Sequence, residues 1–440
     1  MFTRRVFLAS APALAGAAPA KLALDGGSPV REKPLRPRHF GPLYYDESEW
    51  SQLVEVFKAK APFRWYGMDS ANPPRKVITF EKEFAARMQT RYAVAVTSGT
   101  TALQAALAAL AVGPGDEVIV PAWTWHSCFN AVVLAGALPV CAEIDTSFNL
   151  DPADVERHIT PATKVLMIVH LQGNPAHIQP LMEIARKHKL KVLEDCSQSV
   201  GADYRGKPIG SYGDISIASL QVNKTISAGE GGAVYTNSPE LFERAARFHD
   251  MGMLREPHQT WAGGAHVEPF LGTNFRMTEF TGGVLLAQIR KLDQVVADVR
   301  KVAKRVYDGI RDLPKLELRG LPDPAGELGS AIFIGLPDKA KCDRFLKAMA
   351  AENVPASRPG GSVVLPLVPQ IQKKATASPN WPSFSSERGR AMRYDASTCP
   401  KTIRILERFA GVSVDPKYTE KDTADIVAAI RKVYSAILGS

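Results

Sequence analysis

The chain has 440 residues, and 45% of them are hydrophobic, which is enough to fill one large core and a second, smaller one. The formal net charge is +9, but the basic residues are scattered and no nucleic-acid-binding motif accompanies them. Composition and charge therefore indicate a soluble globular protein and argue against a nucleic-acid partner.

The N-terminus is typical of a twin-arginine export signal. Arg4 and Arg5 precede a short apolar region, which ends in the cleavage-site pattern Ala18-Pro19-Ala20. The apolar region is too short for a transmembrane helix, so we expect no membrane span. We expect residues 1–20 to direct export to the periplasm. The alternative is a cytoplasmic protein with a frayed N-terminal extension.

Beyond an N-terminal segment, 21–79, strand-like runs alternate with helical stretches such as Ile178–Leu190. This alternation predicts a mainly parallel α/β sheet in a large domain, 80–310. A small C-terminal domain, 311–440, is predicted from a short strand at Ala331–Ile334 and a last helix beginning at Thr419. The expected strands of the large domain cover 92–96, 117–120, 138–143, 165–170, 191–194, 214–219 and 232–236.

Four short segments follow predicted strands of the large domain. The first, Ser98-Gly99-Thr100-Thr101, comes after Tyr92–Val96 and opens a helix. A turn of this kind can bind an anion, because free N–H groups and the positive end of the helix dipole face the same ligand. The same residues are also typical of a helix N-cap.

The second and third segments offer an aromatic ring and a carboxylate. Trp125 follows the strand at 117–120 and could cover one face of a heteroaromatic ring, whereas Trp123 is expected in the core. Asp195 follows Val192–Leu193 and could bind a protonated ring nitrogen. The alternative for Asp195 is a cap at the end of its strand.

The fourth segment contains Lys224, five residues after Ser219 and just before a glycine-rich turn. Partial desolvation lowers the pKa of a loop lysine, which frees its amine to form a Schiff base, as pyridoxal phosphate enzymes require. About thirty residues separate Asp195 from Lys224, enough for one crossover unit. A lysine without these neighbours would be interpreted as a solvated loop residue. The prediction of a Schiff-base lysine therefore rests on the four segments together.

In this order the segments resemble the DegT/DnrJ/StrS-type family of pyridoxal phosphate aminotransferases acting on keto sugars and cyclitols. The resemblance implies a fold-type I enzyme with a mainly parallel seven-stranded sheet and a smaller α+β C-terminal domain. It implies that Lys224 forms the Schiff base and that Asp195 pairs with the ring nitrogen. The other cofactor-binding residues implied are Ser98, Gly99, Thr100, Thr101, Trp125, Gln198 near the ring oxygen, and Ser219.

The segment 272–279 resembles a further motif of the family, whose asparagine reaches across a homodimer interface to the phosphate of the neighbouring site. The resemblance gives that role to Asn274, so each active site is expected to be shared by two chains. The alternative is that Asn274 caps a helix starting near Thr278. Arg276 is expected to be a structural salt-bridge partner.

The expected reaction moves an amino group from glutamate or glutamine to a keto sugar or keto-cyclitol. Residues 22–31 resemble the leader of the glutamine-dependent inosose and aminohydroxybenzoate synthase branch, which favours a ring ketone. His177 and the segment 171–175 depart from the family pattern near the substrate pocket.

The five cysteines show no cluster-binding spacing, and no metal site is expected. The alternatives are a non-catalytic pyridoxal-binding sensor or a lyase on the same fold. We also expect the long loop 251–272, with His258, Trp261 and His266, to be functional.

Overall fold

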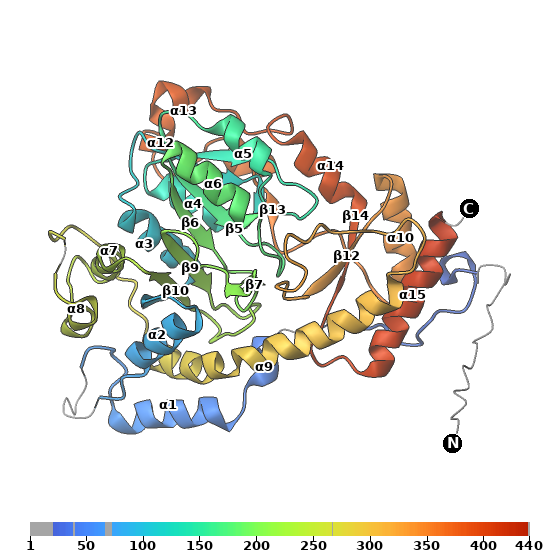
Figure 1. Cartoon of the computed structure of the whole chain (residues 1–440), viewed down its shortest axis with the longest axis horizontal. Coiled ribbons are helices and arrows are strands. Elements are labelled where there is room, and N and C mark those ends of the chain that lie inside the picture. The colour runs from blue at the N-terminus through green and yellow to red at the C-terminus, as the bar shows by residue number, and fades with distance from the viewer. Residues whose placement is uncertain (1–20, 38–39, 67–72, 266, 439–440) are drawn as a thin grey trace, which may run out of the picture.

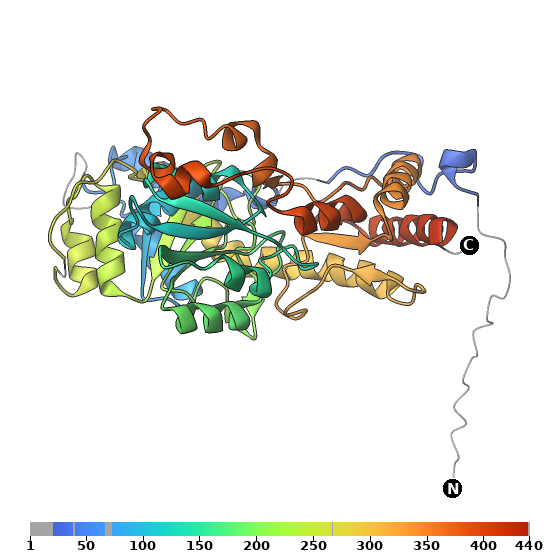
Figure 2. The ribbon, with the colours of Figure 1, turned by 90° about the horizontal axis from the view of Figure 1, so that it is seen from above.

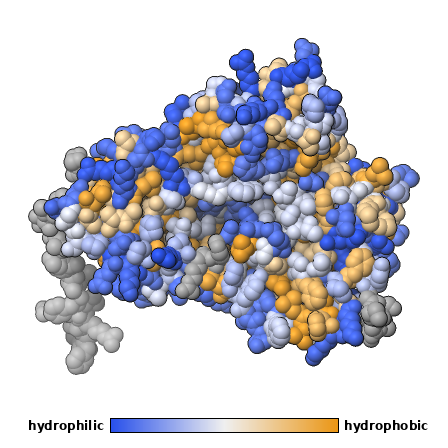
Figure 3. Space-filling model, turned by 180° about the vertical axis from the view of Figure 1, so that it is seen from behind, coloured by the Kyte–Doolittle hydropathy of each residue, from blue (hydrophilic) through white to orange (hydrophobic). Residues whose placement is uncertain are grey.

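The computed structural model describes residues 21–37, 40–66, 73–265 and 267–438 (Figure 1). The predicted export signal and His266 lie outside these residues. Within the described ranges, every helix is too short or too polar to cross a bilayer. Figure 3 shows one face of the molecule, which is mostly hydrophilic with separate hydrophobic patches.

A seven-stranded sheet forms the larger part of the molecule. Strand β10 runs antiparallel to both of its neighbours, and the other adjacent pairs are parallel. This confirms the mainly parallel sheet, and each predicted strand end lies within two residues of the observed one. The spatial order is β1 (Tyr92–Val96), β10 (Gly232–Thr236), β9 (Ile215–Ser219), β6 (Lys191–Asp195), β5 (Thr163–Val169), β2 (Glu117–Pro121) and β4 (Leu138–Ala142).

Helices cover both faces of this sheet, because successive strand residues point to opposite faces and both sets are apolar. Val94 and Val96 of β1 face one helix layer, and Ala93 and Ala95 face the other. The first layer contains α3 (Gly99–Ala109), α4 (His126–Leu134) and α7 (Pro239–His249). The second contains α2 (Lys76–Arg87), α5 (Pro152–His158), α6 (Ile178–His188) and the start of α9 (Glu279–Ile310), with α1 (Glu47–Ala59) packed on α9.

Helix α9 has 32 residues and connects the large sheet to a smaller, three-stranded antiparallel sheet (Figure 2). At 1.5 Å per residue it spans roughly 48 Å. The last helix opens with a capping box, since Thr419 N donates to Asp422 Oδ2 and Asp422 N donates to Thr419 Oγ1. The smaller sheet has the order β11 (Glu317–Leu318), β12 (Ala331–Gly335), β14 (Phe409–Ser413), and packs with α10 (Lys339–Ala351), α14 (Pro400–Arg408) and α15 (Glu420–Leu438).

The segment 363–394 follows α10 of the smaller part in sequence but packs beside the large sheet, where it contributes one strand of a separate two-stranded sheet. Strand β13 (Val363–Val364) pairs antiparallel with β3 (Trp123–Thr124), just before Trp125. Further along, the Tyr394 hydroxyl donates to the carbonyl of Pro139 on β4. The predicted boundary at residue 311 stays a prediction. The return segment also carries η3 (Leu365–Leu367), α11 (Pro369–Gln372), α12 (Pro382–Ser385) and α13 (Glu387–Ala391).

The predicted loop at 251–272 is wrong in one respect, because it contains a short helix, α8 (Glu256–Ala262). Pro257 in the first turn and Gly263 in the left-handed conformation at its C-cap are typical helix signals that outweigh the loop-like composition. His258 is buried and hydrogen-bonded to Glu81, so it packs inside the molecule and does not line the cavity described below.

Candidate active site

A cavity of about 590 Å³ lies where strands of the large sheet end and residues of the smaller sheet approach them. Its size is in the range of small-molecule and cofactor sites, which occur beyond the carboxyl ends of strands in open α/β sheets. Ser330, Ala331 and Ser413 come from the smaller sheet and its edge. Eight of the ten predicted site residues line the cavity: Ser98, Gly99, Thr100, Trp125, Asp195, Gln198, Ser219 and Lys224.

The turn between β1 and α3 forms one wall of the cavity. Ser98 caps the helix, and its Oγ accepts a hydrogen bond from Thr101 N at 3.1 Å. The Thr101 hydroxyl accepts one in return from Ser98 N at 2.9 Å. Thr101 therefore completes a capping box and does not line the cavity, so the structure does not support its predicted place among the cofactor contacts.

The same turn presents hydrogen-bonding groups to the cavity. The Thr100 and Ser127 hydroxyls, from the first turns of α3 and α4, lie 2.6 Å apart. Gly99 packs directly against Ser219 at the end of β9. Hydroxyls, backbone N–H groups and a helix N-terminus are the features of a phosphate site.

Asp195 stands at the end of β6 and is buried. Its Oδ1 accepts a hydrogen bond from Ser197 N at 2.9 Å, and its Oδ2 accepts one from the Cys128 thiol at 3.3 Å. A carboxylate has about four lone-pair sites, so Asp195 can accept another donor from the cavity.

Lys224 lies in the loop after β9, where its backbone N–H donates to the carbonyl of Gln221 at 2.9 Å. Burial lowers the pKa of Lys224, although the nearby charges of Asp195 and Glu230 work in the other direction. Within the described part of the chain, no hydrogen bond holds its amine. A partly desolvated amine with no bound partner is suited to act as a nucleophile.

Two further predicted residues border the opening of the cavity. Trp125 is 52% exposed and immediately precedes α4, whereas Trp123 is buried against Phe148, as expected for a core residue. The Gln198 amide donates to Gly361 O and to Ser362 Oγ, at 3.2 and 3.0 Å. Gln198 therefore connects the loop that contains Gly361 and Ser362 to the cavity wall. The sequence did not indicate this interaction.

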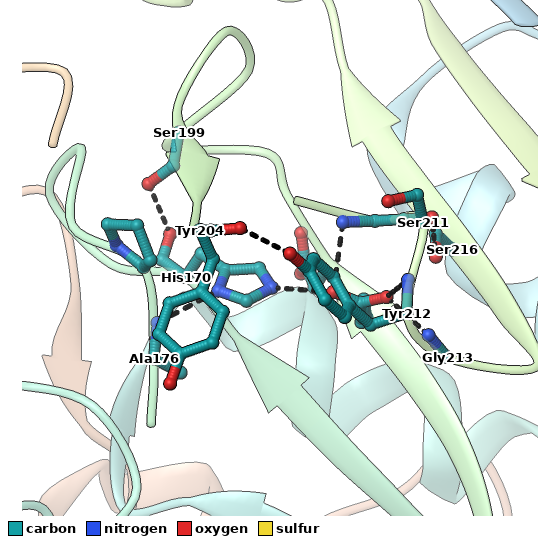
Figure 4. A network of polar contacts seen from close by, with 12 residues as sticks. His170, Ala176, Ser199, Tyr204, Ser211, Tyr212, Gly213 and Ser216 are labelled. Atoms are coloured by element: carbon teal, nitrogen blue, oxygen red, sulfur yellow. Dashed lines mark hydrogen bonds and ion pairs between the residues drawn. The ribbon is translucent and has the colours of Figure 1, made fainter. Parts of the chain in front are cut away.

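A buried polar network surrounds Glu194, the residue before Asp195 on β6, and Figure 4 shows His170, Tyr212 and Gly213 of this network. Glu194 points away from the cavity and accepts hydrogen bonds from His170 Nε2 at 3.1 Å and from the backbone N–H groups of Gly210, Tyr212 and Gly213. Burial opposes ionisation, but these bonds hold the pKa of Glu194 below its ordinary value. The network fixes the end of β6, and thereby the strand position from which Asp195 enters the cavity.

Asn274 lies outside the cavity of its own chain. Its Oδ1 accepts a hydrogen bond from Arg276 N at 3.2 Å, and its backbone forms a bridge with Asp250. The cap of α9 is Thr278, which excludes the predicted alternative that Asn274 caps this helix. Arg276 forms an ion pair with the buried Asp250, which is the structural role expected for it.

Sequence reasoning missed Thr124, Ser127, Cys128 and Glu230, which also line the cavity. Ser127 and Cys128 lie in the first turn of α4, immediately after Trp125. A helix that begins directly after an aromatic residue at a strand end was therefore the signal that could have identified Ser127 and Cys128.

The donor set fits pyridoxal phosphate. Hydroxyl and N–H groups at Ser98–Thr100 suit the phosphate, the Asp195 carboxylate suits the ring nitrogen, and the free amine of Lys224 suits the aldehyde carbon. Gly99 is needed for the fit, because a side chain there would enter the space that Ser219 occupies. Clusters of His, Cys, Asp and Glu that could hold a metal ion are absent from the described ranges.

Comparisons with known proteins agree with this arrangement. Residues 70–360 match the sequence profile of the DegT/DnrJ/EryC1/StrS aminotransferase family. GDP-perosamine synthase of Caulobacter vibrioides is 42% identical over 230 residues, and the match spans 52% of this chain and only 60% of the synthase. L-glutamine:2-deoxy-scyllo-inosose aminotransferase of Streptoalloteichus tenebrarius is 31% identical over 94% of this chain and 98% of that protein. The crystal structure of 3-amino-5-hydroxybenzoic acid synthase has a TM-score of 0.75 at 27% identity, covering 92% of this chain and 100% of that one.

Proposed function

Because the chain belongs to the DegT/DnrJ/EryC1/StrS aminotransferase family, we propose that it is a pyridoxal phosphate-dependent aminotransferase. It moves an amino group from glutamate or glutamine to the keto group of a sugar or cyclitol. The observation that carries this proposal is that Asp195 and Lys224 face one cavity together with the hydroxyl-rich turn at Ser98–Thr100.

Each residue has a distinct task in this function. The turn at Ser98–Thr100 and Ser219 would hold the phosphate, and Trp125 would pack against the ring. Asp195 would keep the ring nitrogen protonated, and the Lys224 amine would hold the cofactor and would serve as the general acid and base of the proton transfer. Bound pyridoxal phosphate supplies an electron sink for this proton transfer.

The acceptor in this proposal is a free keto-cyclitol or keto sugar without a nucleotide. The charged side chains that line the cavity within the described residues are Asp195, Lys224 and Glu230. If pyridoxal phosphate pairs with the first two, Glu230 remains on the cavity wall, and its carboxylate disfavours a diphosphate close to it. The inosose aminotransferase that aligns with nearly the whole chain supports a ring-ketone acceptor and glutamine as donor.

Product analysis tests the activity and the acceptor together. The holoenzyme is incubated with glutamine or glutamate and a panel of inososes, free keto sugars and nucleotide-linked keto sugars, and aminated products are detected by mass spectrometry. Lys224→Ala serves as the control for non-enzymatic products. Amination of inososes or free keto sugars is expected. Amination of nucleotide-linked sugars alone would contradict the acceptor, and no amination with any pair would contradict the activity.

We also propose a homodimer in which Asn274 completes the partner's phosphate site. The amide nitrogen of Asn274 has no hydrogen bond within the described ranges, so both of its N–H donors are available.

Trp50 and Phe57, two turns apart on α1, are 62% and 75% exposed, and Leu271 is 94% exposed. Apolar residues gather over the part of the surface where α1 lies (Figure 3). Such a patch is suited to a second copy of the chain, and sedimentation of wild type against Trp50→Ser/Phe57→Ser tests the contact.

Export is the remaining part of the proposal. Twin-arginine export carries folded, cofactor-loaded proteins, which suits a pyridoxal enzyme, and a free ring ketone is a more suitable periplasmic substrate than a nucleotide sugar. Replacing Arg4 and Arg5 by lysine should retain the precursor in the cytoplasm, as cell fractionation would show. An unprocessed wild-type protein that stays in the cytoplasm would contradict export.

A further inference from the structure

Cys128 contacts the carboxylate on which the proposed chemistry depends. It lies in the first turn of α4, lines the cavity, and places its Sγ 3.3 Å from Asp195 Oδ2. Burial, reinforced by the neighbouring Asp195 charge, raises the pKa of this thiol well above its ordinary value. The thiol therefore keeps its proton and donates a hydrogen bond to the carboxylate.

The carboxylate of Asp195 is held at both oxygens. Ser197 N donates to Oδ1 and Cys128 donates to Oδ2, while the Thr124 hydroxyl lies 3.3 Å from the sulfur and fixes the thiol from its other side. The terminal torsion of an aspartate is broad, so a carboxylate held at one oxygen only can still turn. Two donors on different elements, the turn that follows β6 and helix α4, remove that freedom.

We propose that Cys128 is a positioning residue, which orients the Asp195 carboxylate toward the ring nitrogen of pyridoxal phosphate. The inference rests on the proposed function. A preoriented carboxylate needs no reorganisation when charge develops on the ring, so this hydrogen bond supports turnover more than substrate binding. Among the five cysteines, all buried and all free, Cys128 is the one that lines the cavity in the described part of the chain.

Kinetics of matched variants test this role. Cys128→Ala removes the donor and should lower kcat about tenfold, the size expected for a weak hydrogen bond to a charged group, with KM for the donor within about twofold. Cys128→Ser restores a donor and should recover kcat to within about threefold of wild type. Cys141→Ala removes a buried thiol from the same hydrophobic cluster and should leave kcat unchanged. If Cys128→Ala does not fold, Cys128→Val, which keeps the volume without a donor, carries the same test.

A second readout reports on the ring nitrogen itself. In holoenzyme prepared with ¹⁵N-labelled pyridoxal phosphate, the nitrogen signal should show a protonated ring in wild type and Cys128→Ser, and a partly deprotonated ring in Cys128→Ala. Identical nitrogen signals and equal kcat in Cys128→Ala and Cys141→Ala would overturn the inference, as would a failure of Cys128→Ser to rescue. Failure of wild type to bind the cofactor would instead overturn the proposed function, and the two failures are thus distinguishable.

Discussion

Gly99 and Ser219 touch so closely that a Cβ atom at position 99 would lie 2.6 Å from the Ser219 Cβ. Gly99→Ala should therefore push the phosphate turn away from β9 and weaken pyridoxal phosphate binding about tenfold, or roughly 1.4 kcal/mol. Absorbance titration of the apoprotein with the cofactor measures this. Gly113→Ala is the matched control, because a Cβ there meets nothing within 4 Å. Equal affinities in the two variants would show that the turn can shift without loss.

Lys224 should carry the cofactor. Borohydride reduction of the holoenzyme should add the mass of the reduced cofactor to the peptide containing Lys224, and Lys224→Ala should abolish transamination while the fold is retained. The surface variant Lys421→Ala, whose side chain is 81% exposed, should keep full activity. Labelling of a different lysine in wild type would refute the assignment.

The lowered pKa of Lys224 predicts a pH dependence of the apoprotein's stability. Between its lowered value and the ordinary 10.5, folded Lys224 binds fewer protons than the unfolded chain, so its contribution to the free energy of unfolding rises with pH. The excess stability of Lys224→Met over wild type should therefore shrink as pH rises from neutrality toward 10.5. Denaturant titrations at several pH values measure it. An excess stability that is the same at every pH would contradict the prediction.

Replacing Asp195 by Asn should remove the charge that keeps the ring nitrogen protonated. Turnover should fall by about two powers of ten or more, which corresponds to roughly 3 kcal/mol of barrier. Stopped-flow measurement of the half-reaction with glutamine separates this effect from product release. Turnover within a few-fold of wild type would mean that Asp195 only caps its strand.

Shared active sites can be tested by subunit mixing. Inactive Lys224→Ala chains and Asn274→Ala chains are combined and allowed to exchange. A mixed dimer contains one site with an intact Lys224 and an intact Asn274, so activity should rise above that of either parent. Native mass spectrometry confirms the exchange. Exchange without recovered activity would mean that Asn274 does not serve the partner's site.

The sequence revealed the parts of the site that follow their own strand, but not the contacts between parts. Asp195 and Lys224 could be predicted because each stands a fixed number of residues beyond an apolar run. The thiol of Cys128 lies 67 residues from Asp195 along the chain, and Gln198 meets a loop 163 residues further on. Such pairs are set by how the helices pack on the sheet, which local periodicity does not encode. The hydroxyl of Thr101, which looks available in the sequence, is used by its own helix cap, and this local contact is not evident from the sequence either.

The packing of residues 363–394 beside the large sheet has a consequence for engineering this protein. Val364 pairs with Trp123, and the side chains of Trp381 and Ser383 donate to the carbonyl of Val133 at the end of α4. A chimera in which a relative supplies all residues after 311 would replace the segment that packs on α4. The apolar side chains of α4 would then face residues that did not evolve to pack against them. A compatible exchange would keep 363–394 with the large sheet, so the unit that can be swapped between relatives is discontinuous in sequence.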